Sequence, residues 1–263
     1  MDNSISNYDL NFVKKLQHGL TAEAEELFQL ILDSDLEFLQ TLLKNPQVNE
    51  DHLLALLKRR DLSEELINAI HKKHKHSISH RLVLALVKNP VTSGTLIRNL
   101  LPQLRLFELV DLIYLPGATP DQKLAAERTI QQRLPTTPLG NKITLARRGT
   151  ANMVAELLKD GHPQLFEVCL SNPRLKEAAI YQFLRGATAS AETISMVARH
   201  SRWNQRPNLR LAILKNTKTP VIWFTLWLPK MHRHIMKQLL AGCRSNPKRK
   251  YLIEVELKKR GRS

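Results

Sequence analysis

The chain of 263 residues contains only 2 cysteines and 9 glycines, and aromatic residues make up only 5% of it. Two isolated cysteines form neither a disulfide framework nor a zinc module, which indicates a reducing compartment. The shortage of glycine argues against dinucleotide-binding folds, because these need glycine-rich turns after strands. Leucine is abundant instead, with 46 residues. Many leucines and few aromatics favour helices over sheets, so the composition predicts an all-α protein.

Long apolar runs are also missing. The longest, VIWFTLWL at 221–228, is too short to span a bilayer. The first ten residues, MDNSISNYDL, are polar and acidic and do not resemble a signal peptide. No amphipathic helix with a large exposed apolar face stands out either. We therefore expect a cytoplasmic protein without membrane association.

Acidic residues are absent from one long segment, 193–253, which holds 13 lysines and arginines. Residues 1–130 carry 15 basic and 17 acidic residues, whereas residues 131–263 carry 25 and 7. A field of one sign repels itself and lowers stability, and an anionic partner is the usual compensation. We therefore distinguish a near-neutral N-terminal half, 1–130, from a strongly basic C-terminal half, 131–263.

A shift of 127 residues superimposes the two halves. Residues 45–102 then align with 172–229 without a gap, and 15 of the 58 positions are identical. Most mismatches at apolar positions stay apolar, as in Leu86 and Ile213. Such self-similarity predicts a tandem duplication of two halves of about 127 residues, each built from roughly three units of about 42 residues.

The units consist of short amphipathic helices. In 36–45 (LEFLQTLLKN) the apolar residues have the spacing of a helical stripe. The Asn-Pro pair that follows ends the helix, because proline disfavours helix in the preceding residue. Ser63 and Thr219 are predicted N-caps of later helices. About sixteen helices with this period predict a right-handed α-solenoid that runs as one continuous superhelix, with turn-rich segments at 115–122 and 134–141 joining its halves.

Two units share a further motif. Residues 81–102 (RLVLALVKNPVTSGTLIRNLLP) and 208–229 (NLRLAILKNTKTPVIWFTLWLP) both contain an apolar helix, then Lys-Asn-Pro/Thr-x-Thr, then a second apolar helix. This motif resembles bacterial HEAT-like and leucine-rich-repeat-variant proteins, and the resemblance covers about residues 36–241. It implies a non-enzymatic, HEAT-like α-solenoid that acts as a monomeric scaffold and holds a partner along one surface.

Trp203 lies in a basic link, RHSRWNQRPNLR at 199–210. The shift aligns it with His76, a polar position, whereas Trp223 and Trp227 align with Leu96 and Leu100 and are expected in the core. An aromatic ring among arginines suits a ligand with phosphates and stacked bases. The alternative is a solvated loop whose tryptophan covers the neighbouring helix.

The predicted anion-binding residues come from this link, from the segment 233–237 and from the C-terminal segment 244–250. They are Arg199, His200, Arg202, Trp203, Arg206, Arg210, Arg233, Lys237, Arg244, Lys248, Arg249 and Lys250. The corresponding link of the first half adds a secondary basic set, Lys72, Lys73 and Lys75. The arginines and lysines would contact phosphates, and Trp203 is the stacking candidate. For the C-terminal cations the alternative is a solvated last helix whose dipole they complement.

No pattern in the sequence predicts catalysis or a cofactor. The histidines His71, His74, His76 and His80 cluster without carboxylate or thiol, and neighbouring lysines repel a cation, so we expect no metal. Glycine-rich phosphate loops and the motifs HExxH, GxSxG and CxxC are missing from the sequence. Cys169 aligns with Leu42 and is expected in the core.

Three functions remain open. The leading hypothesis is a module that presents its basic half to DNA, RNA or a ribonucleoprotein. The second is an adaptor that holds an acidic protein partner. The third is an enzyme, because HEAT-like alkylpurine DNA glycosylases are similar in architecture. Their catalytic acidic position has no counterpart here, so the third hypothesis is a fold analogy alone.

Overall fold

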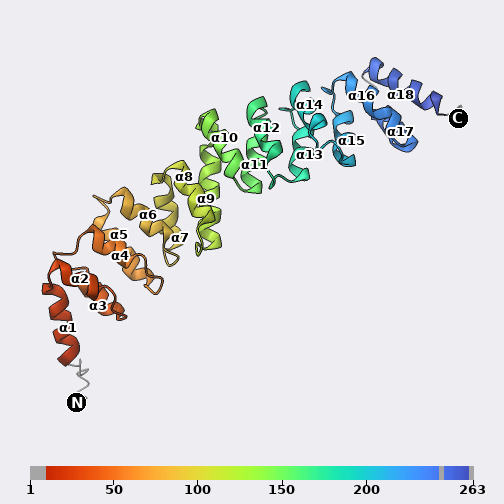
Figure 1. Ribbon diagram of the computed structural model, residues 1–263. Helices are drawn as coiled ribbons and strands as arrows, with labels where there is room; N and C mark the ends of the chain where they lie inside the picture. Colours follow the sequence, from red (N-terminus) through yellow and green to blue (C-terminus); the bar gives the residue numbers. More distant parts are fainter. Residues whose placement is uncertain (1–9, 243–245, 261–263) are drawn as a thin grey trace, which may run out of the picture. The chain divides into compact units, whose positions relative to one another are not determined.

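The computed structural model describes residues 10–242 and 246–260. Every regular element in these residues is helical: eighteen α-helices and three short 3-10 helices occur, and no strand (Figure 1). The predicted all-α class is confirmed. The chain divides into two compact units, Met1–Gln132 (unit 1) and Arg133–Ser263 (unit 2).

Unit 1 contains short helices, most of them of two or three turns. They are α1 (Leu10–Thr21), α2 (Ala24–Leu30), α3 (Leu36–Leu42), α4 (Glu50–Leu56), α5 (Glu64–His74), α6 (His80–Lys88), α7 (Gly94–Leu100), η1 (Leu101–Gln103), α8 (Leu106–Tyr114) and α9 (Pro120–Arg133). The last of these ends at the boundary between the units.

Unit 2 has the same construction. Its helices are η2 (Leu134–Thr136), α10 (Leu139–Arg148), α11 (Ala151–Leu158), α12 (Pro163–Ser171), α13 (Glu177–Arg185), α14 (Ala191–Arg199), α15 (Pro207–Lys215), α16 (Val221–Trp227), η3 (Leu228–Lys230), α17 (Arg233–Gly242) and α18 (Pro247–Lys259).

Most helices pack against the helix that follows the next one in the chain, that is, helix n against helix n+2. In unit 1 the pairs are α1 with α3, α2 with α4, α3 with α5 and α4 with α6. In unit 2 they are α10 with α12, α11 with α13, α12 with α14, α13 with α15, α15 with α17 and α16 with α18. Each helix has an apolar stripe that only its neighbours can cover, as in α6, where Leu82, Val83, Leu86 and Val87 are buried. Alternate helices therefore stack within each unit.

Of the two N-caps predicted from the sequence, Ser63 and Thr219, the structure confirms the first and not the second. The Ser63 hydroxyl accepts a hydrogen bond from the Leu66 N–H, so the predicted cap of α5 is confirmed. Thr219 does not cap α16. The N-cap of that helix is Pro220, and the buried Thr219 hydroxyl donates to the Ile213 carbonyl instead. Thr219 thus secures the end of α15 rather than the start of α16.

Four asparagines join the ends of neighbouring helices. The amides of Asn45, Asn89, Asn172 and Asn216 donate to carbonyl oxygens 23 to 32 residues earlier in the chain. Their Oδ1 atoms accept the backbone N–H of the second residue that follows each of them. The last carbonyls of a helix have no partner within the helix, and these amides supply one. This role explains why asparagine persists at these positions across the 127-residue shift.

Candidate anion-binding groove

Trp203 lies in the core of unit 2. Its side chain is 2% exposed, and its indole N–H donates to the Leu170 carbonyl at 2.9 Å. The Arg202 guanidinium lies 4.2 Å from the ring centroid. No face of the ring is left for a nucleic-acid base, so the prediction that Trp203 is a stacking platform is wrong. A buried indole needs an acceptor, and the end of α12 provides it.

Arg249 points into the protein, whereas Arg202 is exposed and its guanidinium folds back onto the backbone. Arg202 donates to the carbonyls of Asn172, Pro173 and Leu175 at 3.1 to 3.2 Å. Arg249, which is 6% exposed, donates to the carbonyls of Asn216, Thr217 and Thr219.

Each of these two guanidinium groups thus closes the turn that follows one of the joining asparagines. Their donors are used by backbone carbonyls that no helix satisfies. The prediction that Arg249 contacts phosphates is therefore wrong, since its guanidinium is buried, whereas a phosphate contact by the exposed Arg202 stays a prediction. A fork of five N–H donors suits several convergent carbonyls as well as it suits an anion.

The other polar side chains of the 199–210 link differ in how far they are engaged by the protein. Burial, and then the charge of Arg202, lower the pKa of His200, whose Nδ1 lies within hydrogen-bond distance of the Arg202 N–H. Arg210 is half-buried, donates to the Asn204 carbonyl and lies 5.6 Å from the Trp227 ring. Arg199 is exposed, and its Nε donates to the Ser195 carbonyl. Three of the four arginines in the link, Arg199, Arg202 and Arg206, are exposed, so the link adds to the surface charge of unit 2 as well as to its packing.

The other predicted cations are exposed, but none of them lines the groove described next. Arg233, Lys237 and Lys248 are exposed, as are Arg206 and Lys250, which lie 3.9 Å from Glu177 and 3.8 Å from Glu254. Lys72, Lys73 and Lys75 are exposed as well, and Lys73 donates to the Leu43 carbonyl. Arg244 lies outside the described residues.

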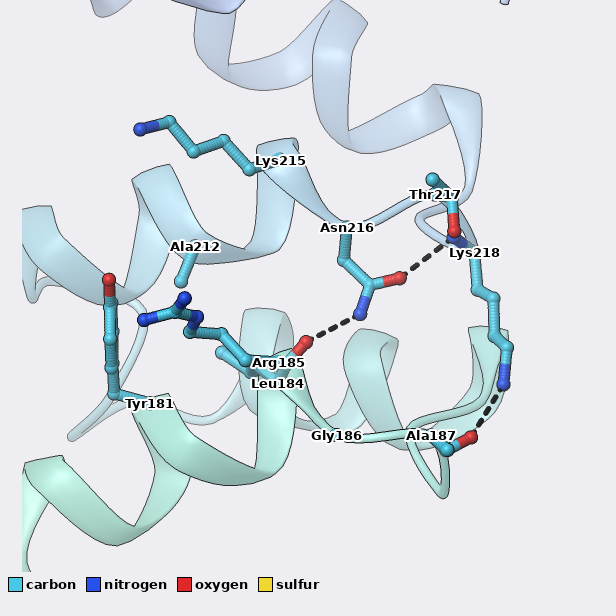
Figure 2. Close-up of a pocket in the computed structure, with 10 residues that line it drawn as sticks. All are labelled: Tyr181, Leu184, Arg185, Gly186, Ala187, Ala212, Lys215, Asn216, Thr217 and Lys218. Atoms are coloured by element: carbon cyan, nitrogen blue, oxygen red, sulfur yellow. Dashed lines mark hydrogen bonds between the residues drawn. The ribbon is translucent and has the colours of Figure 1, made fainter. Parts of the chain in front are cut away.

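A basic groove lies between the C-terminal ends of α13 and α15, with a volume of about 640 Å³ (Figure 2). It is lined by Tyr181, Leu184, Arg185, Gly186, Ala187, Ala212, Lys215, Asn216, Thr217 and Lys218. Figure 2 shows Tyr181, Arg185 and Lys215 at one end of the groove and Lys218 beyond Asn216 at the other. A second cavity of about 490 Å³ continues along the same two helices and shares Tyr181, Ala212 and Lys215 with the first. We call the two together the α13–α15 groove.

Helical spacing places these side chains at the surface. Ile180, Phe183 and Leu184 are buried in α13, so Tyr181 and Arg185 share its exposed side, four residues apart. The Arg185 guanidinium lies 5.8 Å from the Tyr181 ring centroid, and the tyrosine is 38% exposed. On α15 the small side chain of Ala212 leaves room for the cavity, and Lys215 extends from the last turn.

The turn after α15 is held firmly. The Asn216 amide donates to the Leu184 carbonyl, and its Oδ1 accepts the Lys218 N–H at 2.8 Å. The Lys218 ammonium donates to the Ala187 carbonyl at 2.8 Å and remains exposed. These bonds fix the position of the Lys218 backbone relative to α13.

None of the described carboxylates neutralises the three cations that line the first cavity of this groove. Arg185, Lys215 and Lys218 form no ion pair with any of the described carboxylates. Glu177, at the far end of the groove, lies 3.9 Å from Arg206. Three cations and an exposed aromatic ring therefore face one cavity, an arrangement that suits a ligand that has both phosphate groups and planar rings.

The remaining candidates for chemistry stay inert. Cys169 is fully buried, as expected from its alignment with Leu42, and burial raises the pKa of its thiol to about 12, which keeps the thiol protonated at neutral pH. Trp223 and Trp227 are buried, which confirms their predicted core role. Burial and nearby lysines lower the pKa values of His71 and His74. Among the described residues no three His, Cys, Asp or Glu side chains are placed to hold a metal.

None of the helices in the described part of the chain is long and apolar enough to cross a bilayer.

Sequence reasoning missed Tyr181, Arg185, Lys215 and Lys218, although one signal pointed to them. Lys215 aligns with Lys88, and this is the one lysine or arginine among the 15 identical pairs. A lysine that is identical in both halves is thus a better indicator of this groove than a high local density of lysines and arginines. No family model matches this chain, and no curated protein or solved structure matches it either.

Proposed function

We propose that this chain is a non-enzymatic, HEAT-like α-solenoid module that presents the basic surface of unit 2 to an anionic macromolecule. Nucleic acid, as DNA, RNA or a ribonucleoprotein, is the favoured partner. Support for the solenoid comes from the stacking of alternate helices and from the asparagines that join successive helix ends. A glycosylase activity rests on analogy of architecture alone and is not part of the proposal.

The observation that carries the proposal is the α13–α15 groove. Arg185, Lys215 and Lys218 line one cavity without an ion-pair partner among the described residues. Lys215 and Lys218 lie in 193–253, a segment that contains no acidic residue, and Arg185 precedes it by eight residues. Leaving such cations close together costs stability, and bound phosphates would remove that cost. The Tyr181 ring beside them favours a ligand with bases over a peptide of carboxylates.

The proposal is tested by titrating the full chain into fluorescent oligonucleotides, single- and double-stranded, at several salt concentrations. We expect binding with a steep log–log salt dependence, since released counterions supply much of the affinity. The variant R185A/K215A/K218A should lower the slope by about 2, since each contact to a single strand contributes roughly 0.7. Circular dichroism would establish that the variant remains helical.

A matched control removes the same charge outside the groove. The variant R199A/K230A/K248A deletes three exposed cations of unit 2. We expect it to lower the slope much less than the groove variant does. Equal losses would show that net charge alone drives binding and that the groove is not the site. The absence of any binding at low salt would overturn the proposal.

A second function, an adaptor for an acidic protein, is favoured by one separate observation. Val221, Ile222 and Leu226 on α16 are 41%, 55% and 50% exposed. Neighbouring exposed apolar side chains of this kind are typical of protein interaction surfaces. An oligoglutamate peptide with the charge of the oligonucleotide discriminates between the two. An adaptor for an acidic protein would ignore the oligonucleotide, whereas the nucleic-acid module would bind the oligonucleotide more tightly than the oligoglutamate.

A further inference from the structure

Unit 1 has a groove at the place that corresponds to the α13–α15 groove. It lies between α4 and α6, has a volume of about 490 Å³, and is completed by the turn at 115–117. We call it the α4–α6 groove. Adding 127 to Leu57, Ala85, Lys88 and Asn89 gives Leu184, Ala212, Lys215 and Asn216, which are identical in type and line the groove of unit 2.

Packing accounts for three of these four identities. Leu57 and Leu184 are buried, and Ala85 and Ala212 give the helices room. The Asn89 amide donates to the Leu57 carbonyl just as the Asn216 amide donates to the Leu184 carbonyl. The two grooves therefore share a frame. Packing does not require the exposed lysines and arginine that these two grooves also have at corresponding positions.

The cations are nevertheless kept. Lys88 corresponds to Lys215, and Lys58 corresponds to Arg185. Within the described residues, Lys58 and Lys88 have no ion-pair partner. Residues 1–130 have a slight excess of acidic residues, whereas 131–263 have 25 basic and 7 acidic residues. The near-neutral half has thus retained uncompensated positive charge at this groove.

Two further cations line the α4–α6 groove, Arg81 and Arg60. Arg81 forms ion pairs with Glu50 and Asp51, whereas Arg60 forms none with the described carboxylates. Lys218 corresponds to Val91, but Arg60 lies in the groove where unit 2 has Ala187. The Arg60 guanidinium lies directly over Gly117, where a Cβ atom would be 2.7 Å from Nη2. Gly117 also has φ of +85°, which favours glycine. Glycine at 117 therefore makes space for Arg60, and each groove has three cations without an ion-pair partner.

We propose that the α4–α6 groove is a second phosphate-binding site, so that one chain holds two segments of single-stranded nucleic acid at equivalent grooves. This inference rests on the proposed function. Single strands are favoured because the exposed Tyr181 ring in the groove of unit 2 can stack only on unpaired bases. Leu54 replaces Tyr181 in unit 1, so the second site binds phosphate without stacking and is the weaker of the two.

The test is the stoichiometry of binding of hexathymidylate to the full chain, measured by isothermal titration calorimetry and native mass spectrometry at low salt. We expect two oligonucleotides per wild-type chain. One should remain in the variant K58A/R60A/K88A, and one in the variant R185A/K215A/K218A. The variant K14A/K44A/R98A removes three exposed cations of unit 1 outside the groove and should still bind two.

The outcomes separate this inference from the proposed function. A single site in the wild type, lost in the R185A/K215A/K218A variant, would overturn the second site and leave the proposed function intact. Two sites in the K58A/R60A/K88A variant would also overturn it, because the site would then lie elsewhere. No binding at all would overturn both proposals.

Discussion

The side-chain amide of Asn216 donates a hydrogen bond to the carbonyl of Leu184, 32 residues earlier, near the end of α13, the helix on which α15 packs. This bond connects the end of α15 with the end of α13 and forms the floor of the groove between them. Both lysines of the groove flank this asparagine, Lys215 before it and Lys218 two residues after it. The bond that stabilises the stack therefore also sets the spacing of the cations.

Replacing Asn216 with alanine should lower the free energy of unfolding by about 1–3 kcal/mol, because the Leu184 carbonyl loses its partner. Urea denaturation followed by circular dichroism measures this change. The exposed Asn152, replaced with alanine, is the control and should shift stability by less than about 0.5 kcal/mol. Equal effects at the two positions would contradict a joining role for Asn216.

Arg249 should behave as a structural residue and its neighbour Lys248 as a surface residue. The variant R249A should lose about 2–3 kcal/mol of stability, because three carbonyls lose a charged donor. The variant K248A should unfold at nearly the same urea concentration as the wild type. If R249A were as stable as K248A, the inward orientation of the guanidinium would not contribute to stability.

Tyr181 and Leu54 permit a reciprocal exchange between the two grooves. The variant Y181L should weaken single-stranded oligonucleotide binding at the unit 2 site by about 5- to 150-fold, since a base–aromatic stack contributes roughly 1–3 kcal/mol. The variant L54Y should strengthen the unit 1 site, and Y181F should bind like the wild type. Fluorescence anisotropy in each groove-deleted background measures one site at a time. An unchanged affinity in Y181L would remove stacking from the description of the site.

Cys169 should be unreactive in the folded chain at neutral pH. In a variant with Cys243 replaced by serine, a thiol reagent should modify Cys169 only as fast as the protein unfolds. Burial raises the pKa of this thiol to about 12 from 9.0, so the folded state binds the proton more tightly than the unfolded state does. Its contribution to stability is therefore complete below pH 9.0 and falls as the pH rises from 9.0 towards 12. The variant C169A should lack this decline.

The sequence was sufficient to predict the helices and helix starts that depend on the pattern of neighbouring residues. Apolar stripes predicted helices such as α3 and α6, and serine before two glutamates predicted the start of α5. Thr219 shows the limit of such signals, because Thr-Pro has the pattern of an N-cap whereas tertiary packing directs the hydroxyl to Ile213.

The candidate site depended on packing that no local pattern contains. The many arginines around Trp203 indicated a surface site. In the structure, however, Arg202 donates a hydrogen bond to the Asn172 carbonyl of an earlier turn, and Trp203 donates one to the Leu170 carbonyl at the end of α12. The α13–α15 groove joins residues 30 positions apart, such as Arg185 and Lys215, and each residue alone has an ordinary place at a helix end. Only the adjacency of the two helices makes these residues a site.

The joining asparagines also have a consequence for the order of assembly during synthesis. Their hydrogen bonds close loops of 23 to 32 residues, so each can form once the next helix pair has left the ribosome. Structures dominated by such short-range contacts fold rapidly. We therefore expect each unit to gain its structure progressively from its N-terminal end, one helix pair at a time, with little exposure of unpaired apolar stripes.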